Sequence, residues 1–478
     1  MRNWNVKKVI SAPELMPEEH RLKRSLSWPH LTLLGVGAIV GTGILVLTGV
    51  GAAKAGPAVI LSFAIAGIIC AFAALAYAEM ATMYPAAGSA YTYSYVVFGE
   101  LIAWFVGWSL ILEYSLVVSA VAVGWAEHAN LFLDIRGLGL PEFLKHGPDF
   151  DGLRIVQSGI NVLAIFIIAV IAGLLIYGTR ESANLNAVLV VVKLLALAMF
   201  IMVALPAFNG DNFTPFMPHG FPRSGPSGSE VGVMAAAAII FFAFYGFDAI
   251  ATAAEETKNP DRDLAIGIIG SMVLCVLLYM AVAAVAIGAL HYTQFADSGA
   301  PLALILERIG QSWAAQVLAA SAVLTLPTVI LAFFYGQSRI FFTMARDGLL
   351  PTNLARVSSR GTPVRITLFT AVVVAVIAGL FPLADIAALA NAGTLTAFIA
   401  VAAAMLAMRR REPDAPRKFS TPVPWVIGIG AILGCAYLFW SLPEATRRYF
   451  LIWNVLGLVI YLVYAARSAD RTRSAAGA

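Results

Sequence analysis

Long apolar segments separated by short polar stretches run along most of the chain. Each is about as long as the 20 or so residues that a helix needs to cross a bilayer. Where neighbouring segments nearly meet, Gly56-Pro57 and Phe381-Pro382 favour a turn over one continuous helix. The pattern predicts twelve membrane helices, over residues 31–53, 58–83, 95–127, 155–177, 184–206, 231–254, 264–290, 313–343, 366–382, 386–408, 423–442 and 448–466.

Composition agrees with a polytopic membrane protein, because 60% of the residues are hydrophobic, only 12% are charged, and the mean hydropathy is +0.84. The net charge of +4 does not indicate a nucleic-acid partner, since the basic residues lie in short loops between apolar segments. Cys70, Cys275 and Cys435 all lie within apolar runs. We therefore expect no disulfide framework, no metal site and no cofactor.

The distribution of basic residues predicts the orientation. If the N-terminus is cytoplasmic, most of the 31 Lys and Arg residues fall on the cytoplasmic side, as membrane proteins prefer. We expect both termini to be cytoplasmic in a plasma or inner membrane, and an even number of helices. The first 30 residues show no short apolar core with a cleavage site, so no cleaved signal peptide is expected.

Glycines interrupt the first apolar segment. The stretch from Gly35 to Ile44 reads GVGAIVGTGI, and glycine weakens a helix and exposes its backbone polar groups. In lipid those groups must be satisfied by protein, water or a ligand. The stretch is therefore either a broken helix that binds something through its backbone or a small-residue face for helix packing.

A similar interruption occurs in the sixth segment, where Gly246 and Asp248 fall in mid-span. Interrupted helices in corresponding positions of two halves indicate an inverted-repeat transporter with its site near the bilayer midplane. This predicts an all-α fold with two five-helix repeats, broken helices 1 and 6, and two appended helices. The boundaries would be a cytoplasmic segment 1–30, repeats 31–206 and 231–408, an outer loop 207–230, helices 11 and 12 in 409–466, and a cytoplasmic tail 467–478.

Three spaced motifs resemble the amino acid–polyamine–organocation superfamily, nearest to its bacterial relatives of cationic amino acid transporters. They are Gly41-Thr42-Gly43-Ile44; Tyr245-Gly246-Phe247-Asp248 with Glu255-Glu256 and Asn259-Pro260; and Gly336-Gln337-Ser338-Arg339 with Arg346-Asp347-Gly348. The resemblance covers about residues 25–466. It implies the leucine-transporter fold and secondary transport of amino acids.

The two interruptions predict a backbone clamp for a zwitterion. Half-helix N-termini present free N–H groups to an anion, so Gly41, Thr42, Gly43 and Ile44 are candidates for the substrate carboxylate. Carbonyls at the ends of the half-helices would meet the amino group. These candidate carbonyls belong to Ile39, Phe242 and Ala243, and the backbone of Gly246 completes the clamp at the second interruption.

Side chains near the second interruption are further candidates. Tyr245, beside Gly246, is placed to form part of a lid over the substrate, although aromatic residues in such a stretch are often core. Asp248 either contacts the substrate or caps the helix that follows. Leu326 in the eighth segment would form the side-chain end of the pocket and favours a neutral aliphatic substrate, because a buried cation there would lack a partner.

Two ionisable residues inside the membrane are candidates for proton coupling. Lys193 lies in the middle of the fifth segment, and burial favours the neutral form of an amine, so it could exchange a proton. The resemblance implies that it occupies the place of sodium in sodium-coupled relatives. Glu113 in the third segment is its expected partner. In the alternative interpretations, Lys193 satisfies carbonyls without titrating and Glu113 only packs.

Acidic residues near the helix ends, Glu79, Glu255 and Glu256, are expected either to be solvated or to form gate salt bridges, with Arg339 as a partner of one of them. The favoured function is amino acid import coupled to protons by alternating access, so the partners would be an amino acid, the proton and the bilayer. An exchanger or a cationic amino acid transporter of the same fold is the alternative. An enzyme is disfavoured, since the histidines lie in loops or at segment ends and no HExxH or GxSxG motif occurs.

Overall fold

The computed structural model describes residues 6–8, 22–135, 137–151, 154–157, 159–225, 230–296, 298, 300–359, 361–381, 383–442 and 444–469. Most of the predicted cytoplasmic segment 1–30 and of the tail 467–478, and part of the loop 207–230, therefore lie outside the described residues. Within them the protein is helical, with one short antiparallel ribbon of β1 (Asp149–Asp151) and β2 (Arg154–Gln157).

A helix lies within every segment that the apolar pattern predicts, although the fourth, predicted over 155–177, begins in the strand Arg154–Gln157 and is helical only over Val162–Tyr177. Among the described residues, eight helical runs are long and apolar enough to cross a membrane, and the first of them, Trp28–Met83, covers two predicted segments. Three shorter apolar helices, Val162–Tyr177, Val364–Leu380 and Pro424–Trp440, account for the remaining predictions. The protein is thus built as a multi-pass membrane protein.

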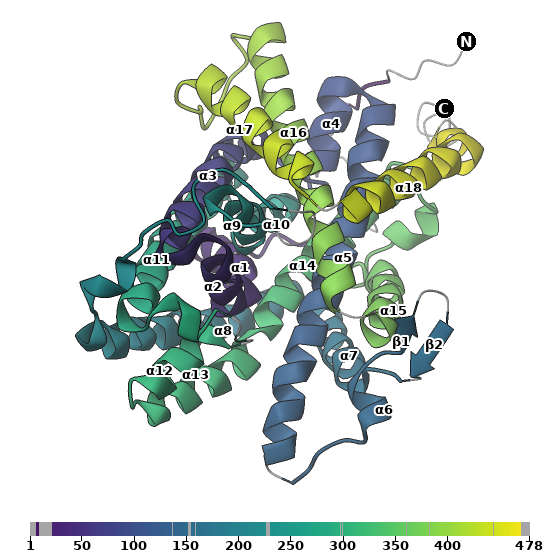
Figure 1. Ribbon diagram of the computed structural model, residues 1–478. Helices are drawn as coiled ribbons and strands as arrows, with labels where there is room; N and C mark the ends of the chain where they lie inside the picture. Colours follow the sequence, from purple (N-terminus) through teal and green to yellow (C-terminus); the bar gives the residue numbers. More distant parts are fainter. Residues whose placement is uncertain are drawn as a thin grey trace.

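The main helices follow one another in the order of Figure 1. They are α1 (Trp28–Ile39), α2 (Thr42–Ala55), α3 (Val59–Met83), α4 (Ala90–Phe98), α5 (Glu100–Ile135), α6 (Glu142–Lys145), α7 (Val162–Tyr177), α8 (Thr179–Ala204), α9 (Val233–Ile240), α10 (Asp248–Thr252), α11 (Pro260–Ala289), α12 (Pro301–Arg308), α13 (Ser312–Thr325), α14 (Pro327–Arg346), α15 (Val364–Leu380), α16 (Leu383–Arg411), α17 (Pro424–Trp440) and α18 (Glu444–Ile460).

Both predicted interruptions are confirmed as helix ends. Helix α1 stops at Ile39, Val40 is extended, and α2 starts after Gly41. In the sixth segment α9 gives way to a 3₁₀ turn over Phe241–Ala243, and α10 starts only after Gly246, whose φ of +126° favours glycine. Each interruption leaves backbone groups outside the helical hydrogen-bond pattern.

Other boundaries differ from the prediction. The third segment, predicted over 95–127, is the helix Glu100–Ile135, because Gly99 with a φ of +96° separates it from the short helix Ala90–Phe98. The eighth segment divides in two at Leu326-Pro327. Proline tolerates the first turn of a helix but breaks a helix interior, which explains a division that hydropathy alone did not predict.

Helices α1 and α2 lie in the middle of the molecule, between α3 and α11 on one side and α5 and α14 on the other (Figure 1). Helix α1 packs on α11, α8 and α14, and α5 packs on α14 and α16. The interrupted helices are therefore surrounded by longer, continuous ones. This arrangement holds the two breaks together in the interior, where their backbone groups are shielded from lipid.

Candidate functional site

A cavity lies where the two interrupted helices meet. It is bounded by the end of α1, the start of α2, the turn that follows α9, and one face each of α5 and α14. Its lining residues are Ala38, Ile39, Gly41, Gly43, Val117, Val121, Phe242, Tyr245, Val329 and Phe333.

Glycine is required where the two breaks touch. A Cβ atom on Gly43 would lie 2.5 Å from the Cα atom of Ala243. A Cβ atom on Gly246 would lie 2.8 Å from the Cβ atom of Ala38. The two backbones therefore pack directly on each other, which brings the N–H groups at the start of α2 close to the turn after α9.

The structure brings five of the predicted substrate residues to the cavity wall: Ile39, Gly41, Gly43, Phe242 and Tyr245. The predicted residues Ile44, Ala243, Gly246, Asp248 and Leu326 are buried next to it or nearby without lining it. Thr42 begins α2, and its side chain lies outside the described residues.

The carbonyl oxygen of Ile39 already has a donor. The hydroxyl of Tyr279, on α11, donates a hydrogen bond of 2.7 Å to it. Because a carbonyl oxygen has two lone pairs, a substrate amino group can share this acceptor or displace the tyrosine. The predicted contact between Ile39 and the amino group therefore has a competitor within the protein.

The sequence predicts Leu326 at the end of the pocket, but Leu326 does not line the cavity. It is the buried residue that precedes Pro327, where α13 ends and α14 begins. Val329 and Phe333, one helical turn apart on α14, face the cavity instead, opposite Val117 and Val121 of α5. The four-residue spacing of Val329 and Phe333 could have indicated a shared helix face. It is not distinctive, because most apolar positions in these helices have another apolar residue four positions away.

Asp248 is placed to satisfy the backbone of the second break. Its carboxylate accepts a hydrogen bond of 3.1 Å from the N–H of Gly246 and another from the hydroxyl of Tyr114. It is the first residue of α10, and its carboxylate also accepts from the backbone N–H groups of Asp248 and Ala249 at the start of that helix. Asp248 therefore satisfies backbone donors both at the break and at the beginning of α10, as expected of a capping residue.

Lys193 reaches the first break from α8. Its ammonium nitrogen donates to the carbonyl oxygens of Gly37, at 3.3 Å, and of Val40, and to the hydroxyl of Thr328 at 2.6 Å. The side chain is 3% exposed. A single ammonium group thus joins α8, the end of α1 and the start of α14.

Glu113 does not pair with Lys193, contrary to expectation. It lies between α5 and α16, where a Cβ atom on Gly393 would be 2.7 Å from its own Cβ atom. Neither carboxylate oxygen has a partner within hydrogen-bond distance among the described residues, and the groups that act on it are the Asp248 carboxylate and the Thr394 hydroxyl. The expected pair fails because residues 113 and 193 face different neighbours, which hydropathy cannot predict.

A family model for amino acid permeases matches residues 26–463. This chain belongs to the amino acid permease family. The permease thus belongs to the amino acid–polyamine–organocation superfamily, as the three motifs indicated.

Three relatives illustrate the range of the permease family. The chain is 44% identical over 451 residues to the branched-chain amino acid permease BcaP of Bacillus subtilis (strain 168), which covers 94% of each protein. It is 38% identical over 463 residues to the methylthioribose transporter of the same organism, covering 96% of this chain and 97% of that protein. It is 37% identical over 413 residues to the vacuolar cationic amino acid transporter 2 of Arabidopsis thaliana, covering 85% of this chain and 63% of that protein.

One end of the permease is held by buried ion pairs. Arg346 of α14 donates two hydrogen bonds, of 2.6 and 2.8 Å, to the carboxylate of Glu255 just after α10. Arg339 pairs with Glu256 at 2.7 Å, which confirms that Arg339 pairs with one of the predicted acids. Lys8 pairs with Asp347 at 2.6 Å. These pairs join the N-terminal segment, the sixth segment and α14.

A second charged cluster surrounds Glu79 at the end of α3. Its buried carboxylate accepts hydrogen bonds from Arg409 of α16 at 2.6 and 2.8 Å, and from Arg417 at 3.2 Å. The backbone N–H of Thr421 adds a bond of 2.8 Å. The salt-bridge role expected for Glu79 is confirmed, and the partners come from the α16–α17 connection.

We expect the Glu255→Gln variant to lose about 3 kcal/mol of free energy of unfolding, because it leaves Arg346 buried without its carboxylate. Burial opposes ionisation of Glu255, yet the adjacent Arg346 prevails and holds the pKa of this carboxyl below its usual value. The stabilisation is therefore present at neutral pH and is lost as the pH falls through that lowered pKa. Denaturant or thermal unfolding in detergent measures it.

Asp261→Asn is the matched control, since the Asp261 side chain is 50% exposed and pairs with an exposed Lys418 at 3.3 Å. An exposed pair contributes at most about 1 kcal/mol. Equal effects of the two carboxyl-to-amide changes would contradict the importance of the buried pair.

Proposed function

We propose that this permease imports neutral branched-chain amino acids across the cell membrane together with protons, by alternating access. In this proposal twelve helices cross the membrane, residues 31–206 and 231–408 form two inverted five-helix repeats, and both termini are cytoplasmic. The bilayer and the two transported species are the partners. No cofactor is required.

The observation that carries this proposal is the chemistry of the cavity wall. Its lining side chains are apolar apart from the phenol ring of Tyr245, and the polar groups offered to a ligand are backbone atoms beside Ala38, Ile39, Gly41 and Gly43. A zwitterion needs polar contacts only for its carboxylate and amino groups, which half-helix ends supply. Val117, Val121, Val329 and Phe333 then suit a branched aliphatic side chain.

The same wall disfavours the substrates named for two of the relatives. The ammonium or guanidinium of a cationic amino acid would be buried in the cavity without a carboxylate on its lining, which is costly. Methylthioribose carries several hydroxyl groups, and Tyr245 is the only lining residue with a hydroxyl among the described residues. Branched-chain amino acids, for which the BcaP relative is named, carry apolar side chains that suit this wall.

Lys193 supports the proton part of the proposal. Two carbonyl oxygens and a hydroxyl surround its ammonium group, and such a set of oxygens also suits a metal cation. When Lys193 releases its proton, the amine keeps two of its three donors and loses its charge, so the contact between α8 and the first break weakens. A proton can then bias the equilibrium between two conformations of the carrier, because it binds them with different affinity.

Glu113 is the second candidate for proton coupling. Its carboxyl group is buried, lies near Asp248 and has no cationic neighbour among the described residues. Holding a proton on one of two nearby buried acids avoids two unpaired negative charges. In this proposal Glu113, on α5, acts separately from Lys193, on α8.

Uptake into proteoliposomes tests the substrate class. We expect leucine, isoleucine and valine to be accumulated under an inward proton gradient, at least tenfold faster than arginine, lysine or methylthioribose. Competition by leucine amide and by N-acetyl-leucine checks the backbone clamp, and both should fail to compete. Preferred uptake of arginine or methylthioribose would refute the proposed substrate, and uptake insensitive to a protonophore would refute the coupling.

A further inference from the structure

A group of buried polar atoms lies behind the substrate cavity, between α3, α4, α5, α16 and the second break. The hydroxyls of Tyr77, Tyr93 and Tyr245, both carboxylate oxygens of Glu113 and the amide oxygen of Asn391 have no hydrogen-bond partner among the described residues. Each of these side chains is at most 6% exposed. Buried polar groups in native proteins are nearly always hydrogen-bonded, either to protein or to ordered water.

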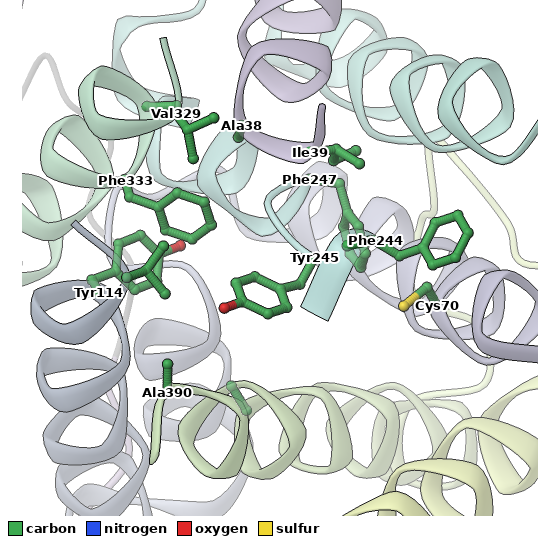
Figure 2. Close-up of a cluster of buried hydrophobic side chains, with 14 of the residues drawn as sticks. Ala38, Ile39, Cys70, Tyr114, Phe244, Tyr245, Phe247, Val329, Phe333 and Ala390 are labelled. Carbon is green, nitrogen blue, oxygen red and sulfur yellow. The ribbon is translucent and has the colours of Figure 1, made fainter. Parts of the chain in front are cut away.

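These side chains lie near one another. Tyr77 and Tyr93 have ring centroids 6.3 Å apart, and Tyr77 lies close enough to Glu113 and Asp248 to interact with their charges. Glu113 faces α16 at Gly393. Asn391 lies two turns before Phe398 on the same face of α16, and the Phe398 ring centroid is 5.5 Å from that of Tyr77. Figure 2 shows the Tyr245 hydroxyl pointing away from the second break, into the region between Tyr114 and α16 near Ala390.

No cation satisfies the group from within the described residues. Its titratable members are acids, phenols and thiols from every element packed around it, and neither carboxylate has an ion-pair partner among them. They are Cys70 and Tyr77 of α3, Tyr93 of α4, Glu113 and Tyr114 of α5, Tyr245 and Asp248 of the second break, and Cys435 of α17. Only Tyr114 and Asp248 bond each other.

We propose that Tyr77, Tyr93, Glu113, Tyr245 and Asn391 enclose a binding site for ordered water molecules, separated from the substrate cavity by the ring of Tyr245. Six unpartnered polar atoms need about two or three waters, because a buried water makes about three hydrogen bonds. Tyr245 lines the substrate cavity while its hydroxyl faces the waters. It therefore forms the wall between the two compartments.

The enclosed water gives Glu113 a partner for proton exchange without exposing it to bulk solvent. Water bridging Glu113 to the Tyr77 and Tyr245 hydroxyls forms a hydrogen-bonded path toward the Asp248 carboxylate, which lies near both phenols. A proton released by Glu113 can pass along this path and be taken up by Asp248. This functional consequence rests on the proton symport proposed above. The presence of the waters does not.

X-ray hydroxyl-radical footprinting of the purified full chain tests the site directly, since radicals formed from ordered water oxidise adjacent side chains. Tyr279 is the matched control: it is as buried as Tyr77, but its hydroxyl is bonded to the Ile39 carbonyl. We expect Tyr77 to be oxidised at least tenfold faster than Tyr279. Oxidation of Tyr77 at the slow rate of Tyr279 would overturn the proposal. Tyr77 is the informative residue, because it does not line the substrate cavity and water in that cavity would not account for its oxidation.

The Glu113→Leu variant adds a second measurement on the same protein. An apolar side chain removes two acceptors and should lower the oxidation of Tyr77 at least threefold, whereas an unchanged rate would count against the water site. Transport separates the two proposals. Tyr77→Phe should slow pH-driven leucine uptake at least threefold while leucine counterflow, which needs no net proton movement, stays unchanged. Fast oxidation of wild-type Tyr77 with normal transport by Tyr77→Phe would keep the water site and refute its role in coupling.

Discussion

Replacing Lys193 by alanine is expected to abolish pH-driven accumulation of leucine, at least tenfold below the wild-type rate. Leucine binding should stay within about tenfold, or 1.4 kcal/mol, because Lys193 does not line the cavity. The alanine removes the only cation that contacts the Gly37 and Val40 carbonyls among the described residues. Without it, protonation no longer changes the contact between α8 and the first break.

Uptake and equilibrium binding measured on the same preparation separate the two effects. Lys418→Ala is the control, since this lysine is 62% exposed and lies in the α16–α17 connection. Accumulation by the Lys193→Ala variant with normal pH dependence would make Lys193 a structural residue. A loss of leucine binding far beyond tenfold would instead make it part of the substrate site.

The apolar segments and the glycine pattern show what the sequence could predict. Hydropathy located a helix over every apolar segment, and glycines at 41, 43 and 246 located both breaks. This succeeded because glycine acts locally: the lack of a Cβ atom permits a close approach or a positive φ wherever it occurs. The cavity accordingly lies where the two breaks were expected to meet.

Tertiary neighbours were less predictable. The sequence predicts Leu326 at the end of the pocket, whereas Val329 and Phe333 line it, because nothing in an all-apolar helix marks the side that faces a cavity. The sequence predicts that Glu113 pairs with Lys193, because both are ionisable and lie in mid-span. In the structure the Lys193 ammonium group instead donates to carbonyl oxygens and a hydroxyl. Nothing in the sequence marks Tyr279 as the donor to the Ile39 carbonyl oxygen, although its hydroxyl makes that hydrogen bond. Such contacts depend on helix rotation and packing, which composition and periodicity do not determine.

Gly43 offers the sharpest test of how the two breaks support binding. In the Gly43→Ala variant the new Cβ atom would lie 2.5 Å from both the Cα and the Cβ atoms of Ala243. One of these is backbone, so the breaks must move apart, and overpacking of this kind costs about 1–3 kcal/mol. We expect leucine affinity to fall at least tenfold, since the N–H groups after Gly41 shift relative to the opposite wall, with a lower melting temperature.

Gly173→Ala is the matched control, because a Cβ atom at this exposed position of α7 meets nothing within 4 Å. Alanine is the better helix former, by about 1 kcal/mol, so stability should be unchanged or raised and transport normal. The double variant Gly43→Ala with Ala243→Gly sharpens the result. It removes one of the two close atoms but keeps the Cα, so it should remain impaired. Full recovery of leucine binding in the double variant would show that side-chain packing, rather than the approach of the two backbones, limits position 43.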